Sequence, residues 1–265
     1  MLTLNSPAKV NLFLKVLNKR EDGYHDIASL FQTIDLFDEI RLKLSDQDEF
    51  TCSDPELQNK ENLVVKAIRL FREKSGKDFF VSCHLVKHIP KEAGLGGGSS
   101  NAATCLNGLN QLLNFPLEND ELLDIARELG SDVPFFLYGG SAYCEGRGDK
   151  IKRIKPLEPK RLWVIKPPEG IPTPEVYKCL DLNQLPSKNP LQTLQDHLLG
   201  KGEYYNDLEA AALSISPAVK ELKEILKAQG FEKVMLSGSG STLIAFDELT
   251  PELPPEYFVR KCRFT

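Results

Sequence analysis

The sequence predicts a protein of two domains in which β-strands and α-helices are interleaved. The chain has 265 residues, and at roughly 100–200 residues per domain this length corresponds to one large domain or two modest ones. Segments whose hydrophobic residues alternate, as in strands, are mixed with segments whose hydrophobic residues recur at helical spacing. Prolines become frequent near residues 150–160. We therefore expect domains at residues 1–152 and 153–265.

The first part of the chain is rich in strands. Alternating hydrophobic residues indicate strands, and glycine or asparagine at the ends of a hydrophobic stripe indicates a helix. In chain order we expect a strand over 10–16, a turn at 20–23, a strand over 40–44, a helix over 62–76 and a strand over 79–89. Asn62 would cap this helix and Gly76 would end it.

The remaining elements follow a glycine-rich loop. In chain order we expect a helix from 102, a helix over 120–130, a strand over 162–165, a helix over 216–230 and two short strands over 233–236 and 242–246. Asp120 would cap the second of these helices. Ser216 and Pro217 stand in the favoured order of cap and first helical residue.

Composition and charge narrow the range of partners. Hydrophobic residues make up 41% of the chain and charged residues 27%, which argues against disordered, collagen-like and coiled-coil proteins. The formal net charge of −5 argues against a cationic surface for nucleic acid. The N-terminal segment has no signal-peptide pattern, and no apolar run approaches the length of a membrane span. We expect a cytoplasmic protein without nucleic-acid or membrane partners, whose six cysteines are free thiols in or near the core.

The strongest local signal is a loop with four glycines in five residues, between a strand and a helix. Glycines let backbone N–H groups approach a ligand, and the helix adds the positive end of its dipole, so the loop suits phosphate. No lysine follows the glycines, which excludes a P-loop, and Ser99 replaces the third glycine of a dinucleotide fingerprint. A flexible linker is the alternative. The loop residues are Gly94, Leu95, Gly96, Gly97, Gly98, Ser99 and Ser100, and Asn101 follows them.

Two charged residues are candidates for catalysis, each with a plainer alternative. Lys9 enters a strand, where a lysine is usually a solvated charge. Asp132 follows the helix-ending Gly130 and precedes apolar residues. It is either a helix cap or a partly desolvated general base with a raised pKa.

Tyr24 and His25 follow the turn at 20–23. They form either an ordinary surface turn or an aromatic pair that reads a base by stacking and hydrogen bonding. His84 and His88 are four residues apart, a spacing that suits a metal pair on a helix rather than on the expected strand. His197 lies in a polar helix and is expected to be exposed.

These segments, in this order, resemble the GHMP kinase superfamily over residues 7 to about 246. The segments that carry the resemblance are 7–14 (PAKVNLFL), 20–25 (REDGYH), 93–103 (AGLGGGSSNAA), 129–136 (LGSDVPFF), 206–209 (NDLE) and 236–241 (LSGSGS). The glycine loop indicates the superfamily. The Asp-Gly-Tyr-His turn narrows the match to a member that acts on a cytidine-containing substrate.

The resemblance implies an α/β fold (α+β) with an N-terminal domain like ribosomal protein S5 and a C-terminal ferredoxin-like domain. It implies an ATP-dependent kinase that uses Mg²⁺. The substrate would be a cytidine diphosphate-linked methylerythritol, phosphorylated on its 2-hydroxyl in the non-mevalonate route to isoprenoid precursors. The protein would be a monomer or a weak homodimer.

The resemblance also assigns roles to residues, though no Mg²⁺ ligand. Asp132 would take the hydroxyl proton, and Lys9 would position and polarise the hydroxyl. Asn62 and Leu63, with the loop and Asn101, would lie near ATP, although both asparagines could also be helix caps. The residues expected on the substrate side are Asn11, Tyr24, His25, Thr173 and Tyr177.

Two other functions compete with this one. The first is a GHMP kinase for another small alcohol, such as mevalonate or homoserine, and the Tyr24-His25 turn argues against it because those substrates have no nucleobase. The second is a catalytically inactive sensor that binds a nucleotide. Lys9 and Asp132 argue against it because a binding module has no need of a base.

Overall fold

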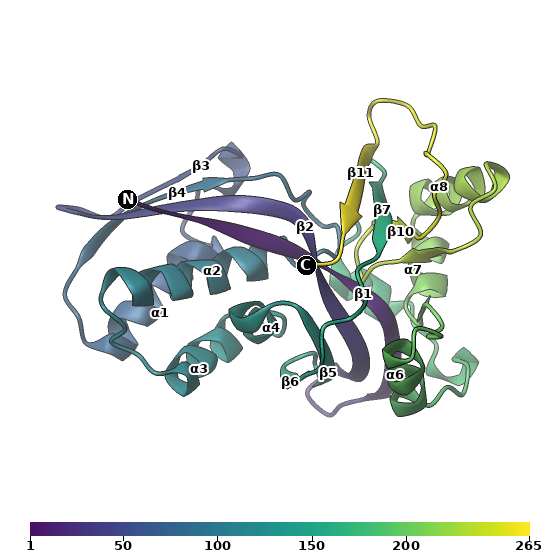
Figure 1. Cartoon of the computed structure of the whole chain (residues 1–265), viewed down its shortest axis with the longest axis horizontal. Coiled ribbons are helices and arrows are strands. Elements are labelled where there is room, and N and C mark those ends of the chain that lie inside the picture. Colours follow the sequence, from purple (N-terminus) through teal and green to yellow (C-terminus); the bar gives the residue numbers. More distant parts are fainter. The chain divides into compact units, whose positions relative to one another are not determined.

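The computed structural model describes residues 1–265 and divides into two compact units (Figure 1). Unit 1 comprises Met1–Ala8, Leu36–Ile89 and Gly96–Gly139, and unit 2 comprises Lys9–Asp35, Pro90–Leu95 and Gly140–Thr265. The long strands β1 (Leu2–Lys19) and β2 (His25–Ser45) contribute residues to both units. The units are thus built from interleaved segments. The domain ranges 1–152 and 153–265 stay a prediction.

Unit 1 is a layer of strands with helices on one face (Figure 1). Its strands run in the order β3-β4-β2, with β3 parallel to β4 and β2 antiparallel to β4. In the register of this antiparallel pair, Glu39 lies opposite Val86. The further elements are β3 (Glu49–Cys52), η1 (Pro55–Leu57), α1 (Leu63–Ser75), β4 (Phe80–Val86), α2 (Gly97–Leu112), α3 (Asn119–Leu129) and α4 (Val133–Tyr138).

The ends of α1 confirm the capping prediction, and the start of α3 corrects one. The Asn62 side chain accepts a hydrogen bond from the Val64 N–H at 3.0 Å, and Gly76 ends α1 in the left-handed conformation. The cap of α3 is Glu118 rather than Asp120, because Glu118 forms a reciprocal capping box with Glu121.

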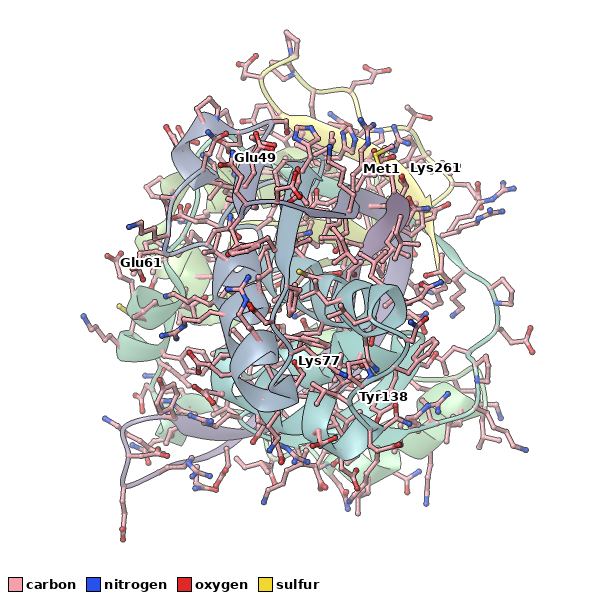
Figure 2. The ribbon with its side chains drawn as sticks, turned by 90° about the vertical axis from the view of Figure 1, so that its left-hand side faces the viewer. Met1, Glu49, Glu61, Lys77, Tyr138 and Lys261 are labelled. Atoms are coloured by element: carbon pink, nitrogen blue, oxygen red, sulfur yellow. The ribbon has the colours of Figure 1, made fainter.

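Helix α2 is the buried centre of unit 1. Ten of its sixteen residues are buried, and Gly108 allows close packing on the strands. A Cβ at Gly108 would lie 2.6 Å from Leu42 Cδ1 and 2.8 Å from Leu4 Cδ1. Charged side chains such as Glu49, Glu61 and Lys77 lie on the exposed surface of this unit (Figure 2). The buried residues of α2 begin at Ser100, so its first turn, residues 97–99, lies nearer the surface.

Unit 2 contains an antiparallel sheet in the order β11-β7-β10-β9. Its portion of β2 pairs with β5, and its portion of β1 pairs in parallel with β8. A single hydrophobic core, which includes Leu222, Leu226 and Leu243, is shared by helices α7 and α8 and by this antiparallel sheet. The elements are β5 (Ser141–Gly146), β6 (Lys150–Arg153), β7 (Arg161–Lys166), α5 (Thr173–Lys178), η2 (Leu182–Gln184), α6 (Pro190–Leu198), β8 (Tyr205–Asn206), α7 (Glu209–Ile215), α8 (Pro217–Ala228), β9 (Val234–Leu236), β10 (Leu243–Ala245) and β11 (Phe258–Arg263).

Most elements expected in the second half are confirmed. Helix α8 begins with Pro217, and the Ser216 hydroxyl accepts a hydrogen bond from the Val219 N–H at 3.3 Å. Strands β9 and β10 pair as a hairpin. All six cysteines are free thiols, and all are buried except Cys179, which is exposed. No helix is both long enough and apolar enough to cross a bilayer.

The expectation for His197 is wrong. Its side chain is buried, its ring stacks on Phe13 at 5.8 Å between centroids, and its Nε2 lies 2.9 Å from the Glu203 carbonyl oxygen. Burial lowers the pKa of His197. The local sequence of α6 is polar, but Phe13 of β1 supplies an aromatic neighbour from far away in the chain.

Candidate active site

The glycine loop passes from unit 2 to unit 1 between Leu95 and Gly96. Gly96 caps α2 in a left-handed conformation, and the first hydrogen bond of the helix runs from the Ser100 N–H to the Gly96 carbonyl at 2.9 Å. The amides of residues 97–99 therefore have no acceptor within the helix. Amides at this position, together with the helix dipole, suit an anionic ligand.

The unit 2 part of the loop packs backbone against backbone on the turn between β9 and β10. A Cβ at Gly94 would lie 2.1 Å from the Ser237 carbonyl oxygen, and one at Gly240 would lie 2.1 Å from the Gly94 nitrogen. The Ser241 N–H donates to the Glu92 carbonyl at 3.2 Å. Gly94 is also left-handed, with a φ of 72°, so only glycine satisfies both its conformation and its space.

Lys9 is a buried lysine, so the alternative of a solvated surface charge is wrong. Its side chain and backbone together are 3% exposed, and its Nζ donates to Asn11 Oδ1 at 2.7 Å. The ammonium also lies 4.5 Å from the centroid of the Phe31 ring. The Lys9 N–H donates to the Leu95 carbonyl at 2.9 Å, which links β1 to the glycine loop.

Asn11 is held in turn by Ser29. The Asn11 Nδ2 donates to Ser29 Oγ at 2.8 Å, and this hydroxyl donates to the Phe13 carbonyl. The amide oxygen of Asn11 is thereby turned toward Lys9. The arrangement fixes the ammonium group of Lys9 within unit 2, on a residue whose backbone is bonded to the glycine loop.

Asp132 stands at the N-terminal cap position of α4, but its side chain makes no capping hydrogen bond. Its backbone is α-helical, with φ −85° and ψ −14°, whereas a capping residue normally has extended backbone that turns its side chain toward the next amides. Asp132 therefore occupies the cap position without a capping hydrogen bond from its side chain, and its half-buried side chain stays a candidate for the base.

The aromatic residues expected on the substrate side lie close together in unit 2. The rings of His25 and Tyr177 stack with centroids 5.0 Å apart and an angle of 23°. Tyr24 is 56% exposed, and the guanidinium carbon of Arg147 lies 4.9 Å from its ring centroid. Burial, with a smaller contribution from Lys19, lowers the pKa of His25. A neutral imidazole stacked on a phenol ring is suited to hydrogen bonding with a flat heterocycle.

Thr173 is tied to the turn that supports the glycine loop. Its Oγ1 lies 2.7 Å from Ser239 Oγ. Ser239 belongs to the same 237–241 turn that packs on Gly94. The segment 236–241 was singled out by its resemblance, but not Ser239 within it, and Arg147 was not singled out at all, because their contacts with Thr173 and Tyr24 join segments distant in the sequence.

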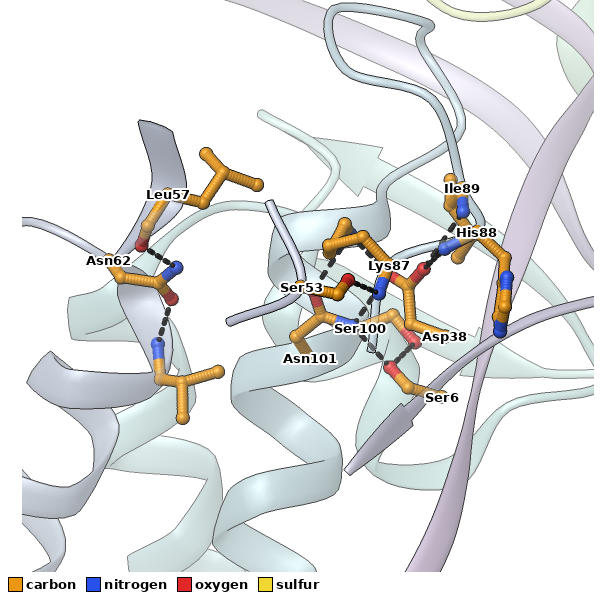
Figure 3. A network of polar contacts seen from close by, with 11 residues as sticks. Ser6, Asp38, Ser53, Leu57, Asn62, Lys87, His88, Ile89, Ser100 and Asn101 are labelled. Atoms are coloured by element: carbon orange, nitrogen blue, oxygen red, sulfur yellow. Dashed lines mark hydrogen bonds and ion pairs between the residues drawn. The ribbon is translucent and has the colours of Figure 1, made fainter. Parts of the chain in front are cut away.

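Asn62, Leu63 and Asn101, the residues outside the glycine loop that are expected near ATP, all belong to unit 1. Leu63 Cδ1 would be 3.7 Å from a Cβ at Gly98. Asn62 caps α1, as described above. Asn101 is not a cap, because it lies inside α2, and its Nδ2 donates to Asp38 Oδ2 and to Ser6 Oγ, each at 2.9 Å (Figure 3). The capping alternative for Asn101 is wrong.

Asp38 and Lys87, two residues that sequence reasoning missed, join this group through a buried ion pair. The sequence pattern of the two strands contained a signal for both residues. Hydrophobic residues of β2 and β4 alternate, and both charged residues occupy positions of the inward-facing parity. A charge at an inward position of a strand is rarely tolerated without a partner.

Comparison with known proteins defines first the class of protein. The model of the GHMP kinases N terminal domain matches residues 62–140, and that of the GHMP kinases C terminal matches residues 189–252. The crystal structure of the Methanococcus jannaschii mevalonate kinase aligns over 100% of this chain and 98% of its own, with a TM-score of 0.70 and 16% identity. This similarity shows a shared fold. The fold and the glycine loop are those of a GHMP kinase.

Closer relatives define the particular family. The 4-diphosphocytidyl-2-C-methyl-D-erythritol kinase of Protochlamydia amoebophila (strain UWE25) is 47% identical over 249 residues, 93% of this chain and 85% of that protein. The Brevibacillus brevis enzyme of the same name is 41% identical over 92% of this chain and 87% of its own length. A crystal structure of 4-(cytidine 5'-diphospho)-2C-methyl-D-erythritol kinase matches 98% of this chain and 99% of that chain, with a TM-score of 0.82 and 32% identity. The chain belongs to the family of 4-diphosphocytidyl-2-C-methyl-D-erythritol kinases.

The close approach at Gly94 generates a prediction. We expect Gly94→Ala to destabilise the protein by about 2 kcal/mol or more, because the left-handed backbone and the added methyl group each contribute a cost. Gly98→Ala is the matched control, since a Cβ there meets only Leu63 at an ordinary 3.7 Å. Urea unfolding of both variants measures the difference. Equal stability of the two variants would contradict the prediction.

Proposed function

We propose that the chain transfers the γ-phosphoryl group of ATP to the 2-hydroxyl of 4-diphosphocytidyl-2-C-methyl-D-erythritol, in the non-mevalonate route to isoprenoid precursors. The observation that carries the substrate assignment is the stacked pair of His25 and Tyr177. A cytosine ring has a flat face to stack and polar edges to bind, and mevalonate and homoserine have neither. The relatives' names support the same assignment.

In the proposed reaction, the Asp132 carboxylate takes the proton of the tertiary hydroxyl. The hydroxyl oxygen then forms a bond to the γ-phosphorus as the bond between that phosphorus and the bridging oxygen of ATP breaks. The electron pair of the broken bond leaves with ADP. A tertiary alcohol is hindered and weakly acidic, so it requires a positioned base.

Lys9 would polarise the same hydroxyl. Its buried ammonium is oriented by Asn11, and a fixed cation in a desolvated place stabilises negative charge developing on oxygen more strongly than a cation in water. Asn11 would also contact the substrate. Asn11 therefore has two proposed uses, one toward the lysine and one toward the methylerythritol part.

The nucleotide would be held by the glycine loop. Amides of residues 97–99 and the hydroxyls of Ser99 and Ser100 would bind phosphate oxygens, and Asn62, Leu63 and Asn101 would lie toward the adenosine part. Mg²⁺ prefers oxygen ligands and keeps several waters, so phosphate oxygens would supply much of its coordination. Ser99, in the first turn of α2, offers the ion a hydroxyl oxygen, and the ion would supply charge neutralisation when bound.

The remaining expectations concern the setting of the enzyme. We propose a cytoplasmic protein that acts on a small molecule without a nucleic-acid partner, as a monomer or a weak homodimer. Size-exclusion chromatography with light scattering measures the last point.

An ADP-release assay with three substrates tests the proposed function. ATP is supplied with the cytidine diphosphate substrate, with mevalonate or with homoserine. Turnover with the cytidine substrate alone supports the proposal. Turnover only with mevalonate or homoserine overturns the substrate assignment, and ATP binding without turnover of any substrate indicates the inactive sensor.

Removal of the proposed base gives the first functional prediction. We expect Asp132→Asn to lower kcat by about a hundredfold or more, because general-base catalysis contributes roughly 10²–10⁴. Asp120→Asn, an exposed carboxylate in the first turn of α3, is the control and should retain wild-type kcat. Steady-state kinetics check both, and a kcat within threefold of wild type for Asp132→Asn would remove its role as the base.

Loss of the Tyr177 ring, which stacks on His25, gives the second functional prediction. We expect Tyr177→Ala to raise the KM for the cytidine substrate about tenfold, since stacking of a base on an aromatic side chain contributes roughly 1–3 kcal/mol. The KM for ATP should stay unchanged. Tyr177→Phe keeps the ring and serves as the control. An unchanged KM for the cytidine substrate in Tyr177→Ala would place cytosine elsewhere.

A further inference from the structure

Asp38 is a fully buried carboxylate that accepts four hydrogen bonds within unit 1. Its side chain is 0% exposed. Oδ1 accepts from the backbone N–H groups of His88 at 2.7 Å and Ile89 at 2.8 Å. Oδ2 accepts from Lys87 Nζ and from Asn101 Nδ2. Both oxygens are therefore saturated, as a buried charge requires.

These four donors come from the two segments that flank the glycine loop (Figure 3). Residues 87–89 follow β4 and lead to Pro90, where the chain enters unit 2, and Asn101 lies one residue beyond Ser100 in α2. The same carboxylate thus holds the segment where the chain leaves unit 1 and, through Asn101, the early part of the helix that begins after the chain returns at Gly96. Ser6 extends the network, because Asn101 donates to its hydroxyl and that hydroxyl donates to Ser100 Oγ at 2.8 Å.

Lys87 carries the network to the first residue of α2. A Cβ at Gly97 would lie 3.3 Å from Lys87 Nζ and 3.0 Å from Ile89 Cγ2. Lys87 Nζ also donates to Asn101 Oδ1 at 3.0 Å. The side chain of Lys87 is 11% exposed, so its ammonium is held beside the amides of the first turn and has little freedom to move.

We propose that Asp38 is a positioning residue for nucleotide binding, which it serves by holding Lys87, residues 88–89 and Asn101 in the geometry that fixes both ends of the glycine loop. The inference rests on the proposed function in one respect, that ATP binds to this loop. Amides and a cation arranged before the ligand arrives need no ordering on binding, so loss of the arrangement lowers affinity.

The prediction concerns affinity for ATP rather than the chemical step. Asp38→Asn has the same shape, but its amide group places donors opposite the donors of Lys87 and Asn101. We expect this variant to raise the Kd and the KM for ATP about tenfold or more. kcat at saturating ATP and the KM for the cytidine substrate should stay within about threefold of wild type, as for loss of uniform binding.

Asp48→Asn is the matched control. Asp48 also accepts from a cation, Arg72, and from a backbone amide of β4, the Val81 N–H at 3.0 Å, but at the opposite end of that strand. We expect it to leave the Kd for ATP unchanged. An equal rise in both variants would show that any loosening of β4 weakens ATP binding, and it would overturn the assignment to Asp38.

A second variant keeps the inference testable if Asp38→Asn does not fold. Lys87→Met retains the apolar stem and removes the ammonium, so it should weaken ATP binding by a similar factor. Where all variants fold, the double variant should bind about as weakly as each single one, because the two side chains act as a unit.

Direct titration of ATP into each folded protein distinguishes a failure of the proposed function from a failure of the inference about Asp38. A wild-type protein that binds no ATP would overturn the proposed function. A wild-type protein that binds ATP while Asp38→Asn and Lys87→Met bind it equally well would overturn this inference alone. A variant that melts at lower temperature but keeps the wild-type Kd would show that the network serves stability only.

Discussion

The direct contact between two stretches of backbone, residues 92–95 and the turn at 237–240, is the constraint on which the candidate site depends. No side chain fits between them, since a Cβ at Gly94 or Gly240 would lie 2.1 Å from a backbone atom. The contact fixes the unit 2 part of the glycine loop, and through Leu95 it fixes the N–H of Lys9. The same turn carries Ser239, which holds Thr173. The contact thus links three sets of residues within unit 2: the part of the glycine loop expected to bind phosphate, the lysine expected to polarise the hydroxyl, and Thr173 on the expected substrate side.

The net charge of the protein does not explain how it would bind anions. A net charge of −5 gives no general attraction for a substrate and a nucleotide that are both polyanions. Two lysines, Lys9 and Lys87, are largely buried, and each donates a hydrogen bond to an amide oxygen, of Asn11 and of Asn101 respectively. A buried ammonium interacts with a nearby anion through a medium of lower polarity than water. Under the proposed function, such lysines and the free amides of the first turn of α2 would attract anions locally, where the net charge of the protein gives no attraction.

Much of this arrangement could be predicted from the sequence, because it depends on local signals. Four glycines before a helix, the Asn62 cap and the Ser216-Pro217 start are written in adjacent residues, and the structure confirms the elements they predict. One error shows the limit of local composition. His197 was expected to be exposed, but Phe13, from a distant segment of the chain, stacks on it. Asp132 had two interpretations, and the absence of its capping hydrogen bond depends on dihedral angles that local composition does not determine. The roles of the site residues themselves stay predictions.

The inward positions of Asp38 and Lys87 could have been predicted from the alternation of hydrophobic residues in the two strands. Alternation over 40–44 assigns one parity of β2 to the core, and continued backward it places Asp38 on that face. The same parity of β4, continued past Leu85, places Lys87 on the core face. The antiparallel register ends with Glu39 opposite Val86, and the residues just beyond that pair, Asp38 and Lys87, form the ion pair. Opposite charges at facing inward positions are costly to bury unless they meet. A search for inward charges of opposite sign on strands that precede a phosphate loop would have found this pair, although the sequence alone does not show that the strands are neighbours. The structure supplies that fact, and with it a reason for the charges to be there.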